Sequence, residues 1–85
     1  MLENGKFYYV YILRSEKKIN QTYIGFSTNL EMRLVDHNRG KTKSTARYFP
    51  WKVENYFAFA SERKARLFEK YLKKGSGRAF RKRHL

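Results

Sequence analysis

Three side chains that suit phosphate-ester chemistry lie close together in the sequence. Arg33 and His37 are four residues apart, so they share a face if this segment is helical. Tyr23 precedes them in a short apolar segment that is typical of a strand. A phenol, a guanidinium and an imidazole at one place would favour binding and hydrolysis of a phosphate ester over binding of an apolar ligand. Taken singly, each has an ordinary structural interpretation, as a core tyrosine, a solvated arginine and a surface or capping histidine.

Glu69 is a carboxylate within an apolar stripe formed by Ala65, Phe68 and Leu72. Such a carboxylate costs free energy unless it is paired or binds a cation. The pattern alone leaves two interpretations open. Glu69 either lies at the exposed edge of the stripe, where Arg66 or Lys73 can pair with it, or it faces a cation site.

The elements that must position these groups follow from hydrophobic periodicity and turn residues. The pattern predicts strands over 7–13, 22–26 and 51–59, joined first by a hairpin loop over 14–21. It predicts helices over 29–38, 62–73 and 77–83. Thr28 and Glu31 have the spacing of a capping box, Ser61 can cap the second helix, and Gly40 and Gly75 are expected to end the first two helices. The order β-β-α-β-α-α indicates a small mixed α/β (α+β) domain.

The third strand and the helices supply the expected core. Alternation places Trp51, Val53, Phe57 and Phe59 on one side of the strand and Lys52, Glu54, Tyr56 and Ala58 on the other. Leu30, Leu34, Phe68 and Leu72 are expected to join the core. Trp51 is expected to pack in the core or anchor a loop, with base stacking as its other interpretation.

The formal net charge of +13 is unevenly distributed along the chain. Residues 39–47 carry four basic residues and no acid, and residues 60–85 carry ten basic residues against two acidic ones. This segregation favours nucleic acid as the partner. The alternative interpretations are a solvated basic surface and an anionic membrane partner. The residues expected to contact phosphate are Lys41, Lys43 and Arg47 in the loop and Arg78 and Arg81 near the end of the chain.

Length and composition limit the number of domains, the kinds of metal site and the localisation that we expect. Eighty-five residues indicate one small domain, over 1–85. The absence of cysteine excludes disulfides and thiolate metal sites. The chain has neither the basic-then-apolar order of a signal peptide nor an apolar run of about 20 residues, so a cytoplasmic protein is expected.

The chain resembles the GIY-YIG nuclease family, and the small stand-alone bacterial members in particular. Tyr23-Ile24-Gly25 matches the second half of the family's motif, and Tyr9-Val10-Tyr11 lies where the first half belongs. Arg33 and His37 have the family's spacing after the second tyrosine. The similarity continues through KTKSTARYFPW and FEKYLKKGSGRAF and covers nearly the whole chain. Tyr9 replaces the first glycine of the motif.

The resemblance implies a three-stranded antiparallel sheet with the first strand central. It implies catalytic roles for Tyr11, Tyr23, Arg33, His37 and Glu69. Glu69 matches the glutamate that binds a divalent metal in the family, and a single carboxylate with waters and substrate oxygens suits magnesium. The tyrosines would position or deprotonate water, with Arg33 lowering the phenol pKa, and His37 would assist proton transfer or bind phosphate. Gly25 is expected to be structural, allowing backbone or phosphate to approach closely.

The sequence departs from the family at one further point. Several members place a supporting asparagine late in the chain, and the segment after Gly75 contains none. The resemblance favours a metal-dependent DNA endonuclease or a nuclease-like DNA repair protein. The alternatives are a catalytically weak nucleic-acid-binding module that keeps the fold, and a basic protein associated with RNA or the ribosome.

Overall fold

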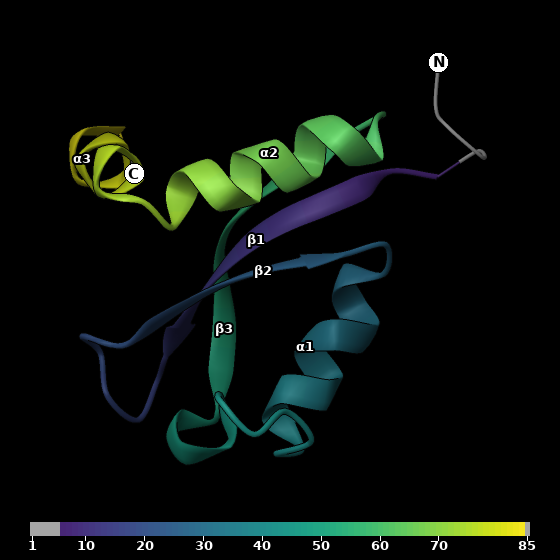
Figure 1. Cartoon of the computed structure of the whole chain (residues 1–85). Coiled ribbons are helices and arrows are strands. Elements are labelled where there is room, and N and C mark those ends of the chain that lie inside the picture. The colour runs from purple at the N-terminus through teal and green to yellow at the C-terminus, as the bar shows by residue number, and fades with distance from the viewer. Residues whose placement is uncertain (1–5, 85) are drawn as a thin grey trace.

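The computed structural model describes residues 6–84, except for the side chains of residues 76, 78–80 and 84. Three strands and three α-helices follow one another along the chain in the predicted order β-β-α-β-α-α (Figure 1). A short 3-10 helix is added in the loop over residues 39–49, which is called the basic loop below. Their bounds are β1 Tyr8–Ser15, β2 Thr22–Ser27, α1 Leu30–Asn38, η2 Ala46–Tyr48, β3 Trp51–Phe59, α2 Glu62–Leu72 and α3 Gly75–His84.

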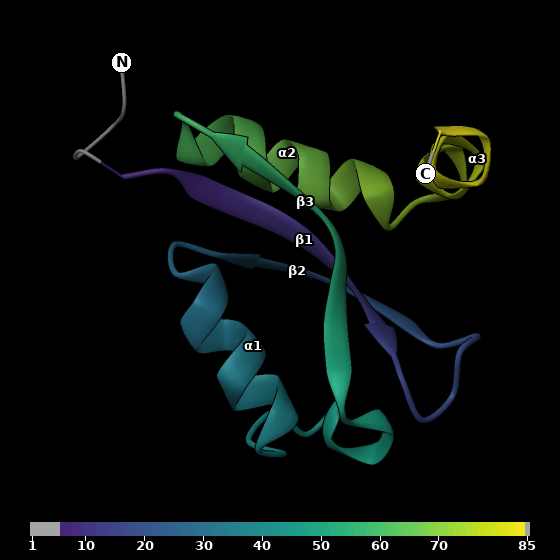
Figure 2. The same ribbon diagram turned by 180° about the vertical axis from the view of Figure 1, so that it is seen from behind.

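The strands form one antiparallel sheet in the order β2-β1-β3, so the first strand is central, as predicted. Tyr11 of β1 pairs with Gly25 of β2 on one side and with Tyr56 of β3 on the other. Figures 1 and 2 show α1 on one side of the sheet and α2 on the other. β2 is therefore an edge strand with helices above and below it.

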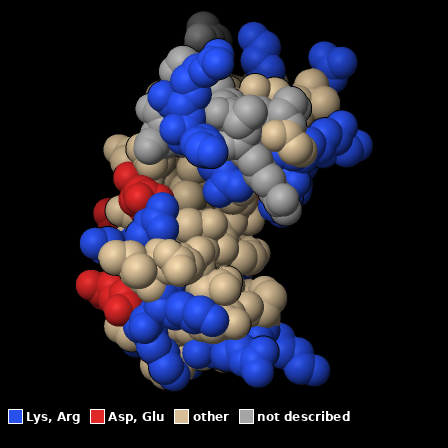
Figure 3. Space-filling view, turned by 90° about the vertical axis from the view of Figure 1, so that its left-hand side faces the viewer, with Lys and Arg blue, Asp and Glu red and all other residues tan. Residues whose placement is uncertain are grey.

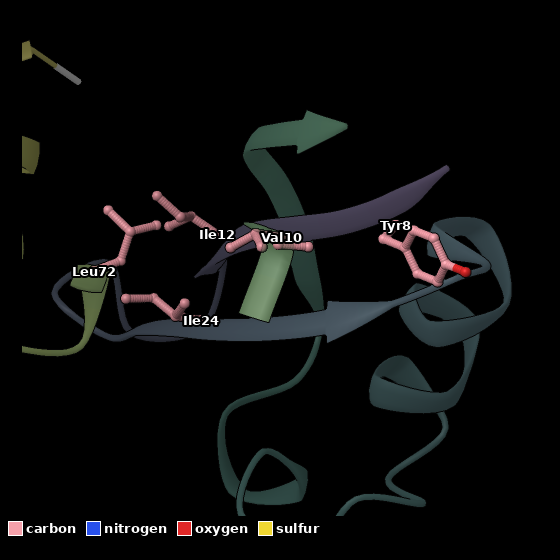
Figure 4. Packing of buried hydrophobic residues seen from close by; sticks show 6 residues of the cluster. Tyr8, Val10, Ile12, Ile24 and Leu72 are labelled. Carbon is pink, nitrogen blue, oxygen red and sulfur yellow. The ribbon is translucent and has the colours of Figure 1, made fainter. Parts of the chain in front are cut away.

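Each face of the sheet has its own hydrophobic core. On the α2 face, Val10, Ile12 and Ile24 pack with Leu72 (Figure 4). Ala65 of α2 belongs to the same cluster. On the α1 face, the buried residues are Tyr11, Leu13 and Trp51, and Leu30 and Leu34 of α1 pack against them. Alternation along β1 produces this division, because successive side chains of a strand point to opposite faces.

The predicted faces of β3 are wrong, because its register shifts between Ile12 and Leu13 of β1. Asn55 pairs with Ile12 and Val53 with Leu13, which leaves Glu54 as an extra residue. A bulge of this kind shifts the alternation by one residue, so odd-numbered side chains before and after it point to opposite faces of the sheet. Consequently Trp51 and Val53 pack on the α1 face, whereas Phe57 and Phe59 pack on the α2 face.

The ends of α1 differ in part from the prediction. Asn29, not Thr28, is the N-cap, and its side chain accepts a hydrogen bond from the Met32 backbone N–H at 3.1 Å. Both residue types cap helices well, so the backbone path decides between them. Gly40 follows the helix with φ of +74°, a left-handed conformation that glycine adopts without steric cost.

The remaining helix ends are closer to prediction. Ser61 caps α2 as expected, accepting from the Lys64 N–H at 3.4 Å. Gly75 is the first residue of α3, while α2 already ends at Leu72. Within the described part of the chain, no helix is long and apolar enough to cross a membrane.

Candidate active site

Tyr11 reaches from the central strand across Gly25 of the edge strand. A methyl group added at Gly25 would overlap the hydroxyl and ring carbons of Tyr11. Glycine is therefore required at this position because the phenol lies directly on the backbone. The group that approaches Gly25 is the Tyr11 side chain, where backbone or phosphate was expected.

His37 is fully buried and links Tyr11 to the basic loop. Its Nε2 atom lies 3.0 Å from the Tyr11 hydroxyl, and its Nδ1 atom lies 2.8 Å from Oγ1 of Thr45. Thr45 donates its own hydroxyl proton to the Thr42 carbonyl at 3.2 Å. Its oxygen therefore accepts from Nδ1–H, which leaves Nε2 to accept the Tyr11 proton. With no exposed surface, His37 cannot bind a phosphate directly, contrary to one of its two expected roles.

Thr45 is held by β3. Its backbone carbonyl accepts the indole N–H of Trp51 at 2.9 Å, and Trp51 is itself buried. The Asn38 side chain in turn accepts from the Trp51 backbone N–H and donates to its carbonyl. Trp51 thus anchors the loop, as expected, and is not available for base stacking. In the sequence, Thr45 is only one of several hydroxyl residues of the loop, and nothing there singles it out.

The environment keeps both partners of the Tyr11–His37 hydrogen bond neutral. Burial raises the pKa of Tyr11 above its ordinary value, although the hydrogen bond and charge of Arg33 partly oppose this. Burial, followed by the Arg33 charge, lowers the pKa of His37. Arg33 lowers the pKa of the Tyr11 phenol, as expected, but desolvation has the larger effect, so this pKa is raised overall. Tyr11 is therefore protonated and His37 is a free base near neutral pH.

Tyr23 and Arg33 form the accessible side of this cluster. The Tyr23 ring lies 4.9 Å from the His37 ring and 6.3 Å from the Tyr11 ring, measured between centroids, and is half-buried. The Arg33 side chain is 35% exposed, 3.9 Å from Asp36, and interacts with the Tyr11 phenol. A guanidinium with exposed donors beside two phenols is suited to hold an oxyanion.

Glu69 lies on α2, which covers the opposite face of the sheet from α1 and contacts all three strands (Figure 1). Its charge raises the pKa of Tyr11, so it lies within electrostatic reach of the phenol. Its side chain is 18% exposed and accepts from Lys73 Nζ at 3.0 Å. This is one of the two expected ion pairs, while Arg66 pairs with Glu62 instead.

Among the side chains that the structure describes, no cluster of three or more His, Asp or Glu residues is placed to enclose a metal ion. Glu69 is thus a single carboxylate with a cationic partner already at its oxygen. This donor set fits a magnesium ion that keeps most of its waters and takes further oxygens from a substrate. It does not fit zinc, which takes three or four protein ligands.

A hollow of about 310 Å³ adjoins Tyr23 and is lined by Thr22, Tyr23, Ile24, Lys73 and Arg81. The Nε atom of Arg81 is buried and has no hydrogen-bond partner among the described residues. Lys73 and Arg81 make the lining of this hollow basic, which suits an anion. Arg81 was predicted to contact phosphate, and so was Arg78, whose side chain lies outside the described part of α3.

The three loop residues expected to bind nucleic acid, Lys41, Lys43 and Arg47, are all exposed. Lys41 Nζ lies 3.7 Å from Asp36, on the helix that also carries Arg33 and His37. Figure 3 shows Lys and Arg side chains gathered toward the top and toward the bottom of this face, with a mostly uncharged surface between them that carries acidic and basic side chains at its left edge. The basic loop also supplies Thr45, so it directly adjoins the cluster.

Tyr9, which stands where the family has glycine, lies away from this cluster. It lines a second hollow with Tyr56 and residues 28–31, and its ring centroid is 6.0 Å from that of Tyr56. This hollow therefore lies between the start of α1 and β3.

Comparison with known proteins agrees with this geometry. A family model described as the GIY-YIG catalytic domain matches residues 7–83. No curated protein matches the chain. The family model spans every strand and helix that contributes to the cluster.

Proposed function

We infer that this chain, which belongs to the GIY-YIG family of nuclease domains, is a metal-dependent DNA endonuclease acting through one domain that spans the chain. The observation that carries the proposal is the buried hydrogen-bonded series Tyr11–His37–Thr45 beside Arg33. It supports hydrolysis because it gives a phenol a neutral imidazole as proton acceptor. Such an arrangement is needed to take a proton from water at neutral pH.

Water activation in this proposal uses the two buried groups together. The Tyr11 oxygen takes a proton from the attacking water while its own proton passes to Nε2 of His37. The resulting imidazolium keeps its Nδ1–H bond to Thr45. The water oxygen then forms a bond to phosphorus while the bond to the leaving oxygen breaks. The leaving oxygen takes up a proton from solvent, and the imidazolium passes its extra proton back through Tyr11 to solvent, which restores the starting state. Tyr11 is 1% exposed, so Arg33 must move from the phenol onto the phosphate before water reaches it.

Arg33 and Tyr23 bind the phosphate in this scheme. The guanidinium donates to two non-bridging oxygens and offsets the charge that develops on them. Tyr23 positions the phosphate or the water from the exposed side of the cluster. His37 stays behind Tyr11 and acts only on the proton.

Glu69 is the residue that would hold a divalent metal, and its coordination chemistry matches magnesium best. When bound, the metal would neutralise charge on the phosphate and stabilise the leaving oxygen. Lys41, Lys43, Arg47, Arg78 and Arg81 are proposed to contact the phosphates of the DNA backbone.

A second candidate function is a nucleic-acid-binding module with little or no catalysis. It is favoured by the absence of an asparagine after Gly75, the region where several family members place a supporting one. RNA is the alternative substrate in either case, since none of the contacts named above reads a base or a 2′-hydroxyl.

Cleavage assays on duplex, branched and single-stranded DNA and on RNA test the proposal. The native chain should cut a DNA substrate only with a divalent metal, and both Glu69→Gln and Arg33→Ala should abolish cleavage with the fold and most affinity kept. Glu62→Gln is the matched control, because Glu62 is an exposed glutamate on the same helix. Binding without cleavage of any substrate would favour the module, and cutting by Glu69→Gln would refute the metal assignment.

A further inference from the structure

Lys73 lies between two parts of the surface that the proposed chemistry uses. Its ammonium group is 3.0 Å from Glu69 Oε2, and the same side chain lines the hollow beside Tyr23. The Lys73 side chain is 51% exposed, whereas that of Glu69 is only 18% exposed. The lysine is thus the mobile partner of the pair, on a long flexible stem with a compact charge.

The hollow has the character of a phosphate site. Lys73 and Arg81 supply two cations, Thr22 supplies a hydroxyl, and the Arg81 Nε atom is buried without a described acceptor. A phosphate presents several acceptor oxygens to such donors. Because Tyr23 lines the same hollow, a phosphate there would be next to the one held by Arg33.

We propose that Lys73 couples nucleic-acid binding to metal binding. In the free protein it neutralises Glu69. When a backbone phosphate enters the hollow, Lys73 turns to it together with Arg81 and leaves the Glu69 carboxylate open to a divalent cation. This inference rests on the proposed function and adds a binding order to it. Nucleic acid binds first, and the metal site becomes available only then.

Two physical constraints support this exchange. A lysine ammonium and a divalent cation repel each other and compete for the same carboxylate, so Glu69 holds one or the other. The removal of Lys73 without a replacement would leave a largely buried carboxylate unpaired, which a metal would then compensate. Coupling between two sites is reciprocal, so metal must tighten nucleic-acid binding by the factor by which nucleic acid tightens metal binding.

Calorimetric titration with Ca²⁺ tests the coupling without relying on catalysis. The titration uses the full chain, alone and saturated with a short DNA duplex whose integrity is checked afterwards. We expect DNA to tighten Ca²⁺ binding by at least about 5-fold, in the usual range for coupled sites. Lys73→Met should bind Ca²⁺ about 5-fold more tightly than the native chain without DNA, and DNA should add little further. Glu69→Gln should bind no Ca²⁺ at this site.

Lys70→Met is the matched control, because Lys70 is an exposed lysine of the last turn of α2, the helix that Lys73 caps at its C-terminal end, and the variant has the same loss of charge. It should behave like the native chain. Equal coupling in the Lys73 and Lys70 variants would mean that the counterion atmosphere of the DNA accounts for the effect, and would overturn the proposal. Absence of coupling in a chain that cleaves DNA would refute this inference alone. Coupling in a chain that cuts nothing would uphold it and refute the nuclease.

Discussion

The Tyr11 hydroxyl donates to Nε2 of His37 across 3.0 Å in a fully buried contact between the central strand and α1. Burial keeps the phenol protonated and the imidazole neutral. The pair is therefore poised to pass one proton from tyrosine to histidine, and its state is sensitive to pH.

The first prediction concerns acid stability. Because the folded pKa of His37 lies below its ordinary value of 6.5, the unfolded chain binds a proton below about pH 6.5 that the folded chain lacks. The free energy of unfolding should thus fall as pH drops through this range and should not depend on His37 above it. Thermal unfolding from about pH 5 to about pH 8 measures this, together with an NMR titration of the His37 ring.

His37→Gln should flatten this pH dependence, and His84→Gln, which removes the other histidine of the chain, should not affect the part due to His37. An NMR pKa at or above 6.5 for the His37 ring would contradict the assignment whether or not the glutamine variant folds. The cleavage rate should also fall as the pH drops through this range, because a protonated His37 cannot accept the Tyr11 proton.

The second prediction concerns Gly25. Gly25→Ala places a methyl group on the Tyr11 phenol, so we expect a loss of about 1–3 kcal/mol in the free energy of unfolding, as for overpacked cores. Gly75→Ala is the control, because an added methyl there has no neighbour within 4 Å. Denaturant unfolding of both variants measures the difference.

A second substitution separates steric overlap from other causes. Gly25→Ala should cost less stability in a Tyr11→Ala background than in the native chain, because the overlapping group is then gone. A Tyr11→Phe background should not lower this cost in the same way, since the ring carbons also overlap the added methyl. Equal stability of the Gly25 and Gly75 variants would show that the packing of the Tyr11 ring does not require glycine at position 25.

The order of elements was predictable from the sequence, and some side-chain positions were not. Periodicity and turn residues identified the strands and helices and were consistent with the central position of β1. They cannot locate a bulge, so the exchange of faces between Val53 and Phe57 was missed. Nor could the pattern select Thr45 from Thr42 and Ser44, because its role depends on where Trp51 holds the loop.

The third prediction concerns the basic loop. Lys41, Lys43 and Arg47 are exposed, so their replacement by alanine should leave the fold intact while weakening DNA binding. The slope of log affinity against log salt should become shallower by about 0.9 for each phosphate that the variant no longer neutralises. Fluorescence anisotropy at several salt concentrations measures the slope. An unchanged affinity and slope would place the DNA elsewhere on the surface.

The last prediction concerns Thr45, which touches His37 but not the solvent. Thr45→Val keeps the shape of the side chain and removes the only oxygen that fixes Nδ1–H in the described structure. Without that acceptor, the imidazole is no longer held in the tautomer that leaves Nε2 free for the Tyr11 proton. We expect kcat to fall by about 10- to 100-fold, comparable to the loss of a partner that orients a histidine, with DNA affinity unchanged. Thr45→Ser should restore the rate, because it returns the hydroxyl without the methyl group. A valine variant with native kcat, or a serine variant as slow as valine, would show that Thr45 only packs against His37 and does not orient it.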